Sequence, residues 1–179
     1  MNKKSVFHLI ADVTEKAGVS CILIGGFAVN YYRVTRQTAD VDFLITKEDF
    51  DKIVALLERA GYKRELFQEN FAQLKSTKLS LLDVDFMFVE PATLAKILKE
   101  GQEMEIAKQK FSVPSLEHLI ALKLHSIKYN PRQRLNKDFP DIINLIQTNG
   151  MNFKEERFKQ LCLKFGDDEI YKKILEALG

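Results

Sequence analysis

Two pairs of residues in the first quarter of the chain have the types and spacing that metal and phosphate chemistry requires. Gly25 and Gly26 follow a short apolar run, and the thirteen residues 27–39 separate them from Asp40 and Asp42. A glycine pair lets the backbone approach a ligand closely, and the amide groups that begin a following helix bind phosphate. Two aspartates spaced by two project to the same side of a strand. The combination predicts metal-assisted transfer of a nucleotide.

The two carboxylates imply a divalent cation. Like charges placed so closely repel each other, and hard oxygen ligands suit Mg²⁺ or Mn²⁺. Asp83 and Asp85 share one face of a second apolar strand and either could supply a third ligand. We favour Asp85, because the apolar run 86–89 follows it and places it within the strand, while Asp83 would support the site from outside or lie on the surface. For Asp40 and Asp42, the alternative is that both are solvated side chains on an exposed strand edge.

Three further residues are candidates for nucleotide binding. Arg36 and Thr38 lie just before the first aspartate strand, where Arg36 could pair with a phosphate or with Asp42, and Thr38 could support the metal ligands. A solvated arginine and a strand-forming threonine are the alternatives. Lys123 lies in an apolar helical stretch, where a charge requires a partner, and is a candidate to bind a triphosphate.

Periodicity and turn residues predict the elements that position these side chains. Strands are expected over 21–24, 40–45, 79–89 and 105–113, with one or two more in 62–75, and helices over 6–17, 27–32, 47–60, 92–100, 115–128, 137–148, 154–165 and 168–178. Mixed elements followed by helices alone indicate an α+β fold with a C-terminal helical bundle. We therefore expect a core domain over 1–114, with Pro114 at the boundary, and a helical region over 115–179 packed on it.

Composition narrows the class of protein. Of the 179 residues 46% are hydrophobic and 29% charged, and the net charge is +2, which is typical of a globular protein and excludes disordered, fibrous and membrane classes. Cys21 and Cys162 lie far apart in apolar surroundings, which favours two buried thiols over a disulfide or a zinc site. No apolar run approaches ~18 residues, and residues 1–17 lack an apolar signal core. We expect a cytoplasmic protein with no membrane partner.

The glycine and aspartate motifs resemble those of the nucleotidyltransferase superfamily, which has the polymerase-beta-like fold. Its signature is an apolar residue, Gly, Gly or Ser, a gap, and then Asp-apolar-Asp-apolar, which residues 24–26 and 40–43 match. The run 36–42, Arg-Gln-Thr-Ala-Asp-Val-Asp, is most similar to AbiEii-type and related stand-alone bacterial enzymes. Those proteins also tend to have a lysine and a basic-Asp pair, comparable to Lys123 and 137–138.

The resemblance implies a mixed β-sheet flanked by helices and a role for each motif residue. Gly25 and Gly26 would hold the triphosphate, Asp40 and Asp42 would bind both metals, and Asp85 would complete the site and help to deprotonate the acceptor. The chain would move an NMP from an NTP to a hydroxyl of an RNA 3′ end, a protein or a small molecule, with release of pyrophosphate.

Other functions remain open from the sequence. A cognate toxin or antitoxin partner is one expectation of the resemblance. A non-catalytic nucleotide-binding or partner-binding module of the same fold is an alternative, as is a phosphohydrolase or nuclease that uses the same carboxylates on water.

Overall fold

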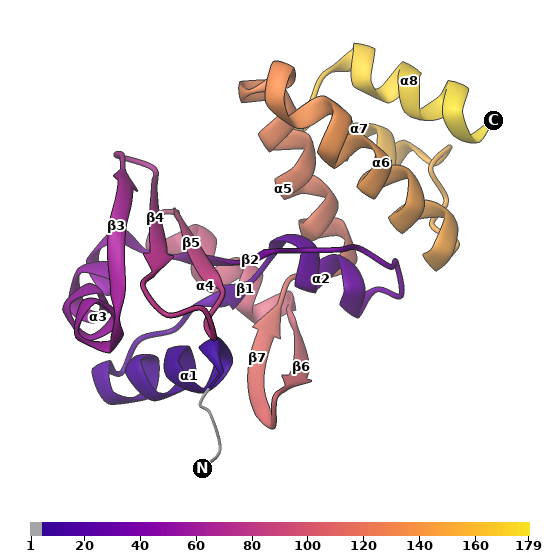
Figure 1. The fold of residues 1–179 in the computed structure, drawn as a ribbon. Helices are drawn as coiled ribbons and strands as arrows, with labels where there is room; N and C mark the ends of the chain where they lie inside the picture. Colours follow the sequence, from indigo (N-terminus) through magenta and orange to yellow (C-terminus); the bar gives the residue numbers. More distant parts are fainter. Residues whose placement is uncertain (1–4) are drawn as a thin grey trace. The chain divides into compact units, whose positions relative to one another are not determined.

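The chain forms two compact units, each built from two segments. The computed structural model describes residues 5–179, so the N-terminal end of the predicted core domain, residues 1–4, lies outside the described residues. The first unit, here called the core unit, comprises Met1–Ala28 and Gln37–Ser115. The second, the helical unit, comprises Val29–Arg36 and Leu116–Gly179. Figure 1 shows the elements of both units. The predicted boundary at Pro114, and the packing of 115–179 on the core, stay predictions.

The core unit contains a mixed sheet of seven strands in the order β3-β4-β5-β2-β1-β7-β6. β1 pairs antiparallel with β2 and parallel with β7, and β2 pairs parallel with β5. This confirms the α+β class. The strands are β1 Ile22–Leu23, β2 Asp40–Ile45, β3 Tyr62–Phe67, β4 Phe71–Ser76, β5 Asp83–Phe88, β6 Gln102–Ile106 and β7 Gln109–Val113. The helices that lie wholly in this unit are α1 Val6–Ala17, α3 Lys47–Ala60 and α4 Pro91–Glu100.

Aromatic side chains form the core on one face of the sheet. Phe43 of β2 and Phe86 of β5 stack with ring centroids 5.8 Å apart, and Phe50 of α3 packs 5.2 Å from Phe86. Phe7 of α1 lies 5.8 Å from Phe111 of β7, and α1 lies beside α3 (Figure 1). Because side chains alternate along a strand, the residues next to Phe43 and Phe86 project from the opposite face.

The strand that carries the predicted site is followed by a well-defined helix. The Thr46 hydroxyl accepts a hydrogen bond from the amide of Asp49 at 3.1 Å and so caps the start of α3. At its other end, Gly61 adopts φ +111, a conformation that other residues rarely adopt. α3 buries the side chains of Phe50 and Leu57, which fixes the orientation of β2 against the core.

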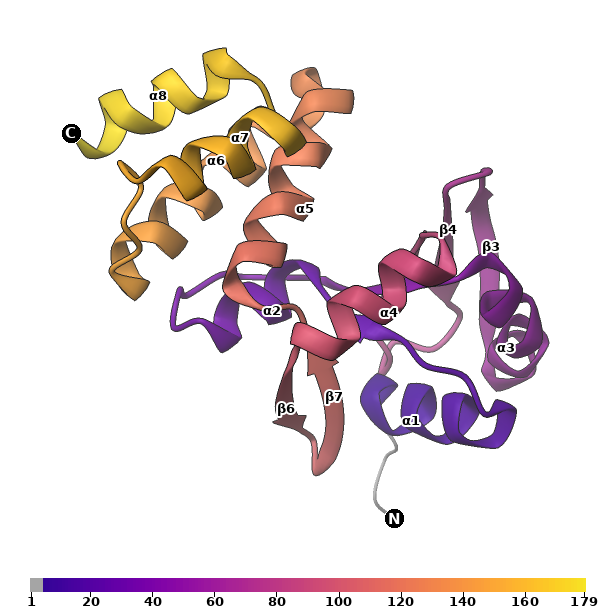
Figure 2. The ribbon, with the colours of Figure 1, turned by 180° about the vertical axis from the view of Figure 1, so that it is seen from behind.

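The helical unit consists of α5 Leu116–Tyr129, α6 Pro131–Asn149, α7 Glu156–Phe165 and α8 Asp168–Leu178, together with the segment Val29–Arg36. α5 packs against α6 and α7, and α7 lies next to α8 (Figure 2). The remaining helix, α2 Gly25–Tyr31, begins in the core unit and ends in the helical unit. None of the helices formed by residues 5–179 has the length and apolar character needed to span a bilayer.

Four predicted elements differ from the structure. α2 begins at Gly25 rather than at residue 27, and β5 begins at Asp83 rather than at 79 because a turn occupies the residues before it. The single strand expected over 105–113 is a hairpin, β6 and β7. α6 begins at Pro131, six residues before the expected start, because proline is well suited to the first turn of a helix.

Candidate active site

The two aspartate strands lie next to each other in a register that pairs their acidic residues. β2 and β5 are parallel, with Asp40 opposite Asp83 and Asp42 opposite Asp85. Val41 and Phe43, which alternate with the two aspartates of β2, are fully buried, whereas Asp40 and Asp42 are partly exposed on the opposite face. The alternation predicted from the sequence is confirmed, and it gathers acidic side chains on the face of the sheet away from the aromatic core.

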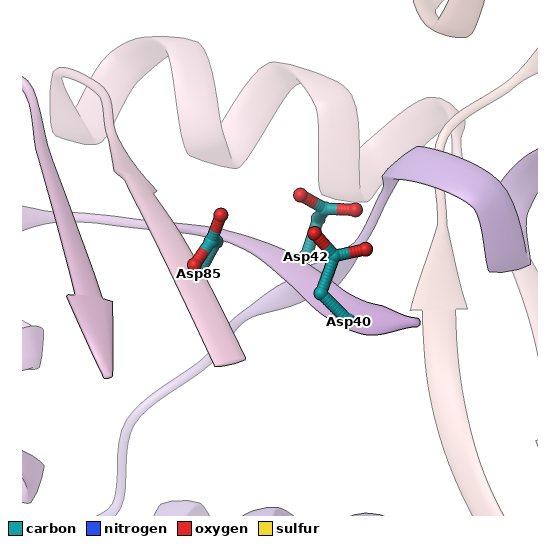
Figure 3. Close-up of side chains that lie close together, drawn as sticks. All are labelled: Asp40, Asp42 and Asp85. Carbon is teal, nitrogen blue, oxygen red and sulfur yellow. The ribbon is translucent and has the colours of Figure 1, made fainter. Parts of the chain in front are cut away.

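Three carboxylates form one cluster on that face. Asp40, Asp42 and Asp85 each offer a carboxylate oxygen, and these oxygens lie within 4.8 Å of one another. Figure 3 shows all three side chains on the same side of their strands. A set of three converging carboxylate oxygens fits a hard divalent cation such as Mg²⁺ or Mn²⁺, which prefers oxygen ligands. The donor set thus fits the predicted metal, although the identity of the ion and the roles of these residues stay predictions.

Hydrogen bonds from neighbouring segments hold the carboxylates of Asp40 and Asp85. The Thr38 hydroxyl lies 2.9 Å from the main-chain oxygen of Asp40 and 3.1 Å from its Oδ1, so its one proton is shared between them. The amide Nε2 of Gln73, on β4, donates to Oδ2 of Asp85 at 3.0 Å. The sequence indicated Thr38 as a support for the ligands. It gave no signal for Gln73, because the pattern over 62–75 is mixed.

The glycine pair lies against the cluster. Gly25 has φ +64, and a Cβ placed on it would lie 1.9 Å from Oδ2 of Asp42. A Cβ on Gly26 would lie 2.7 Å from Cβ of Thr38. The amide of Ile24 donates to the main-chain oxygen of Asp42 at 2.9 Å, which ties the turn to β2. The structure thus brings Gly25, Gly26 and Thr38 together with the carboxylates.

Asp83 lies outside the cluster. Its Oδ1 accepts a hydrogen bond from the amide of Ser76 at 2.9 Å, which fixes the loop between β4 and β5. Burial, and next the charge of Asp83, raise the pKa of Tyr62 to about 12, and the Tyr62 hydroxyl donates to the main-chain oxygen of Leu82 at 2.7 Å. The structure thus places Asp85 next to Asp40 and Asp42, and its role as the third metal ligand stays a prediction.

A pocket of about 190 Å³ opens beside the cluster within the core unit. It lies over the strands β2 to β5, whereas the glycine pair follows β1 on the other side of β2 in the sheet order. Its lining is formed by Ala39, Asp40, Glu65, Gln73, Leu74, Lys75, Asp83 and Asp85. Lys75 pairs with Glu65 at 2.6 Å, so the pocket wall is polar and carries both charges.

Arg36 and Lys123 belong to the helical unit, where both contact Asp141. Arg36 Nε lies 3.1 Å from Asp141 Oδ1, and Lys123 Nζ lies 2.7 Å from Asp141 Oδ2 and 2.9 Å from Asp138 Oδ1. Lys123 and both aspartates are buried. The partner that a lysine in an apolar helix requires is therefore a pair of carboxylates on α6. Asp141 was missed in the sequence, although its spacing of three from Asp138 places both on one helix face.

Comparison with known proteins identifies the relatives of this chain. The profile of a family described as uncharacterised nucleotidyltransferase matches residues 7–175. A search of curated proteins gives no match.

Solved structures with the same fold include proteins that act on antibiotics. The chain is similar to the antibiotic-resistance factor ANT(2″)-Ia, with a TM-score of 0.66, 16% identity and coverage of 95% of this chain and 92% of that one. It is also similar to lincosamide antibiotic adenylyltransferase LnuA with bound lincomycin, with a TM-score of 0.54, 19% identity and coverage of 78% and 93%. A third is an antigenic nucleotidyltransferase-like protein from Paracoccidioides brasiliensis, with a TM-score of 0.57, 18% identity and coverage of 96% and 91%. Identities this low establish the fold alone.

Proposed function

The chain belongs to the family of uncharacterised nucleotidyltransferases, and from this premise we propose that it transfers an NMP from an NTP to a hydroxyl acceptor with a divalent metal bound. The observation that carries the proposal is the cluster of Asp40, Asp42 and Asp85 beside the Gly25-Gly26 turn. The narrower resemblance to AbiEii-type enzymes, a cognate toxin or antitoxin partner and a cytoplasmic location stay predictions.

Each motif would contribute a separate part of the reaction. Asp40, Asp42 and Asp85 would hold Mg²⁺ or Mn²⁺. When bound, the ion would neutralise phosphate charge and lower the pKa of the acceptor hydroxyl. The main chain at Gly25 and Gly26 has no side chain to keep a triphosphate away, so its amide groups can approach the phosphate oxygens. Thr38 would keep the Asp40 carboxylate oriented through its shared hydrogen bond.

The chemical step exchanges a phosphoanhydride bond of the NTP for a phosphate ester bond to the acceptor. The acceptor oxygen attacks the α-phosphorus of the NTP, a new P–O bond forms, and the bond from that phosphorus to the bridging oxygen breaks. Pyrophosphate leaves with the electron pair of that bond. The proton of the acceptor hydroxyl passes to a carboxylate oxygen of Asp85 and from there to water. Arg36 and Lys123, both paired with Asp141, stay predicted contributors to nucleotide binding.

The acceptor is the open part of the proposal. An RNA 3′ end, a protein side chain and a small molecule all offer hydroxyls. Among the proteins of similar fold, one was solved with adenylyl-2″-tobramycin and one with lincomycin. Antibiotics of these two classes are therefore the small molecules to test first.

The test follows a labelled phosphate. The protein is incubated with each α-³²P-labelled NTP and Mg²⁺ or Mn²⁺, and separately with tobramycin, lincomycin, total RNA or a protein extract. We expect label in one acceptor fraction with wild type and with Asp83→Asn, and none with Asp42→Asn. Release of labelled NMP alone, with no acceptor labelled, would instead identify a hydrolase. Label that stays in the NTP would identify a non-catalytic module, which binds nucleotide if adding nucleotide raises the melting temperature and binds another partner if it does not.

A further inference from the structure

Gln73 contacts the acidic cluster through a defined hydrogen bond, although it lies outside the glycine and aspartate motifs. It lies on β4 directly opposite Asp85 in the antiparallel pairing of β4 with β5. Its Nε2 lies 3.0 Å from Asp85 Oδ2. An ionised carboxylate can only accept hydrogen bonds, so the amide must present its NH₂ group to Asp85. The chemistry of the pair therefore fixes the orientation of the amide.

The backbone holds this donor in place. β4 lies between β3 and β5 in the sheet, and Ala72 and Leu74 on either side of Gln73 are buried. The main chain of Gln73 is thus fixed by the strands and buried residues around it, and only its side-chain torsions remain free to vary. A hydrogen bond from such a position restricts the rotation of the Asp85 carboxylate about its terminal torsion. The carboxylate oxygen that Asp85 contributes to the cluster is therefore held in position as well.

A comparable support exists for another member of the cluster. The Thr38 hydroxyl reaches Asp40 Oδ1 at 3.1 Å, so the Asp40 carboxylate, like that of Asp85, receives a hydrogen bond from a neutral side chain. Neutral donors orient a carboxylate without competing with a cation for its charge. Residues that hydrogen-bond to metal-ligating carboxylates typically change metal affinity or activity by 10–100-fold when they are removed.

We propose that Gln73 is a positioning residue, whose amide holds the Asp85 carboxylate in the orientation that completes the divalent metal site with Asp40 and Asp42. The inference rests on the proposed function, because it assigns a metal to the cluster. It adds a residue that is absent from the Gly-Gly and Asp-x-Asp motifs and that lines the pocket beside the cluster.

The test measures metal binding without any nucleotide or turnover. Mn²⁺ is titrated into metal-free protein by calorimetry for wild type, Gln73→Met and Gln109→Met. Methionine keeps the length of the side chain and removes the donor. Gln109, on β7, is the matched control, because its amide donates to the main-chain oxygen of Lys108 at 3.0 Å, away from the cluster. We expect the Mn²⁺ Kd to rise about tenfold or more for Gln73→Met and to stay unchanged for Gln109→Met.

A double-variant cycle separates positioning from packing. If Gln73 acts through Asp85, then Gln73→Met has no further effect on the Mn²⁺ Kd in an Asp85→Asn background. Melting temperatures in EDTA are measured for every variant, and Gln73→Val, a strand-forming substitution, replaces Gln73→Met if the latter folds poorly. An equal Kd for wild type and Gln73→Met, or equal effects in both backgrounds, would overturn the inference. A wild-type protein that binds no Mn²⁺, with or without NTP, would overturn the proposed function instead.

Discussion

Gly25 and Asp42 lie so close together that neither position is independent of the other. A Cβ on Gly25 would lie 1.9 Å from Oδ2 of Asp42, well inside van der Waals contact, and Gly25 adopts φ +64. Glycine is therefore needed at position 25 to leave room for the Asp42 carboxylate, as well as for any phosphate that binds there. This contact explains why a glycine turn and an Asp-x-Asp strand form a single unit of structure.

Replacing Gly25 by alanine should abolish metal binding at the cluster. The new methyl group would displace the Asp42 carboxylate from the position in which it meets Asp40 and Asp85. Gly18→Ala is the matched control, because Gly18 has nearly the same φ, +63, but nothing within 4 Å of a Cβ. The left-handed conformation should cost each variant about 1 kcal/mol in folding free energy, and the clash with Asp42 should add to this cost for Gly25→Ala alone. Only Gly25→Ala should lose Mn²⁺ binding in calorimetry. Equal Mn²⁺ affinity in the two variants would contradict the contact.

Asp42→Asn should separate catalysis from stability. The amide removes a charged ligand, so the transfer rate should fall by at least about 100-fold. Loss of a residue that only hydrogen-bonds to a metal ligand already lowers activity by up to about 100-fold. In metal-free buffer the variant should unfold at the same or higher urea concentration than wild type, because one of three mutually repelling carboxylates is gone. Asp83→Asn is the control, since its remaining carbonyl oxygen can still accept the bond from Ser76. Normal transfer by Asp42→Asn would exclude a ligand role for this residue.

The sequence predicts the side chains of the cluster better than the contacts that support them. Alternation within 40–45 is a local property, so the common face of Asp40 and Asp42 follows from the residue order. The pairing of Asp42 with Asp85 depends on the register between strands far apart in the chain, which no local pattern specifies. The same holds for Gln73, whose role depends on the strand that lies beside β4. The partners of Lys123 depend likewise on the packing of α5 against α6.

The hairpin of β6 and β7 shows a second kind of limit. Ala107 and Lys108 form its two-residue turn with φ +52 and +60. Two positive φ values define a type I′ turn, for which Asn-Gly is the preferred sequence. Ala107 and Lys108 are not residues that favour this turn, so the sequence pattern predicts one continuous strand over 105–113.

Replacing this turn by Asn-Gly should stabilise the protein. The double substitution Ala107→Asn and Lys108→Gly relieves the left-handed strain and should raise the free energy of unfolding by roughly 0.5–1 kcal/mol. Urea denaturation measures the change. Lys96→Gly, the same replacement at an exposed position inside α4, should destabilise by about 1 kcal/mol. A loss of stability from the turn variant would argue against the type I′ conformation.

Lys123→Met should strongly destabilise the helical unit. It would leave Asp138 and Asp141 buried without the ammonium group that lies 2.9 and 2.7 Å from them. Breaking a buried pair in this way typically costs about 3–5 kcal/mol. Adding Asp138→Asn and Asp141→Asn should recover part of the loss, because the buried charges are then removed. Lys172→Met, which breaks an exposed pair with Asp168, should change urea denaturation little. A similar small effect for Lys123→Met would contradict the buried cluster.

The two thiols should react slowly in the folded protein and with a distinctive pH dependence. Burial raises the pKa of Cys21 and of Cys162 to about 12, and only the thiolate attacks alkylating reagents. The thiolate fraction should therefore rise about tenfold per pH unit from pH 8 to 11 in the native state. In urea, where the thiols have their ordinary pKa near 8.5, the rate should level off above about pH 9. Iodoacetamide labelling followed by mass spectrometry measures both profiles, with Cys21→Ala and Cys162→Ala to assign the sites. Cys162 is buried and Cys21 is partly exposed, and native thiols that label as fast as those in urea at pH 8 would show that the fold does not raise their pKa.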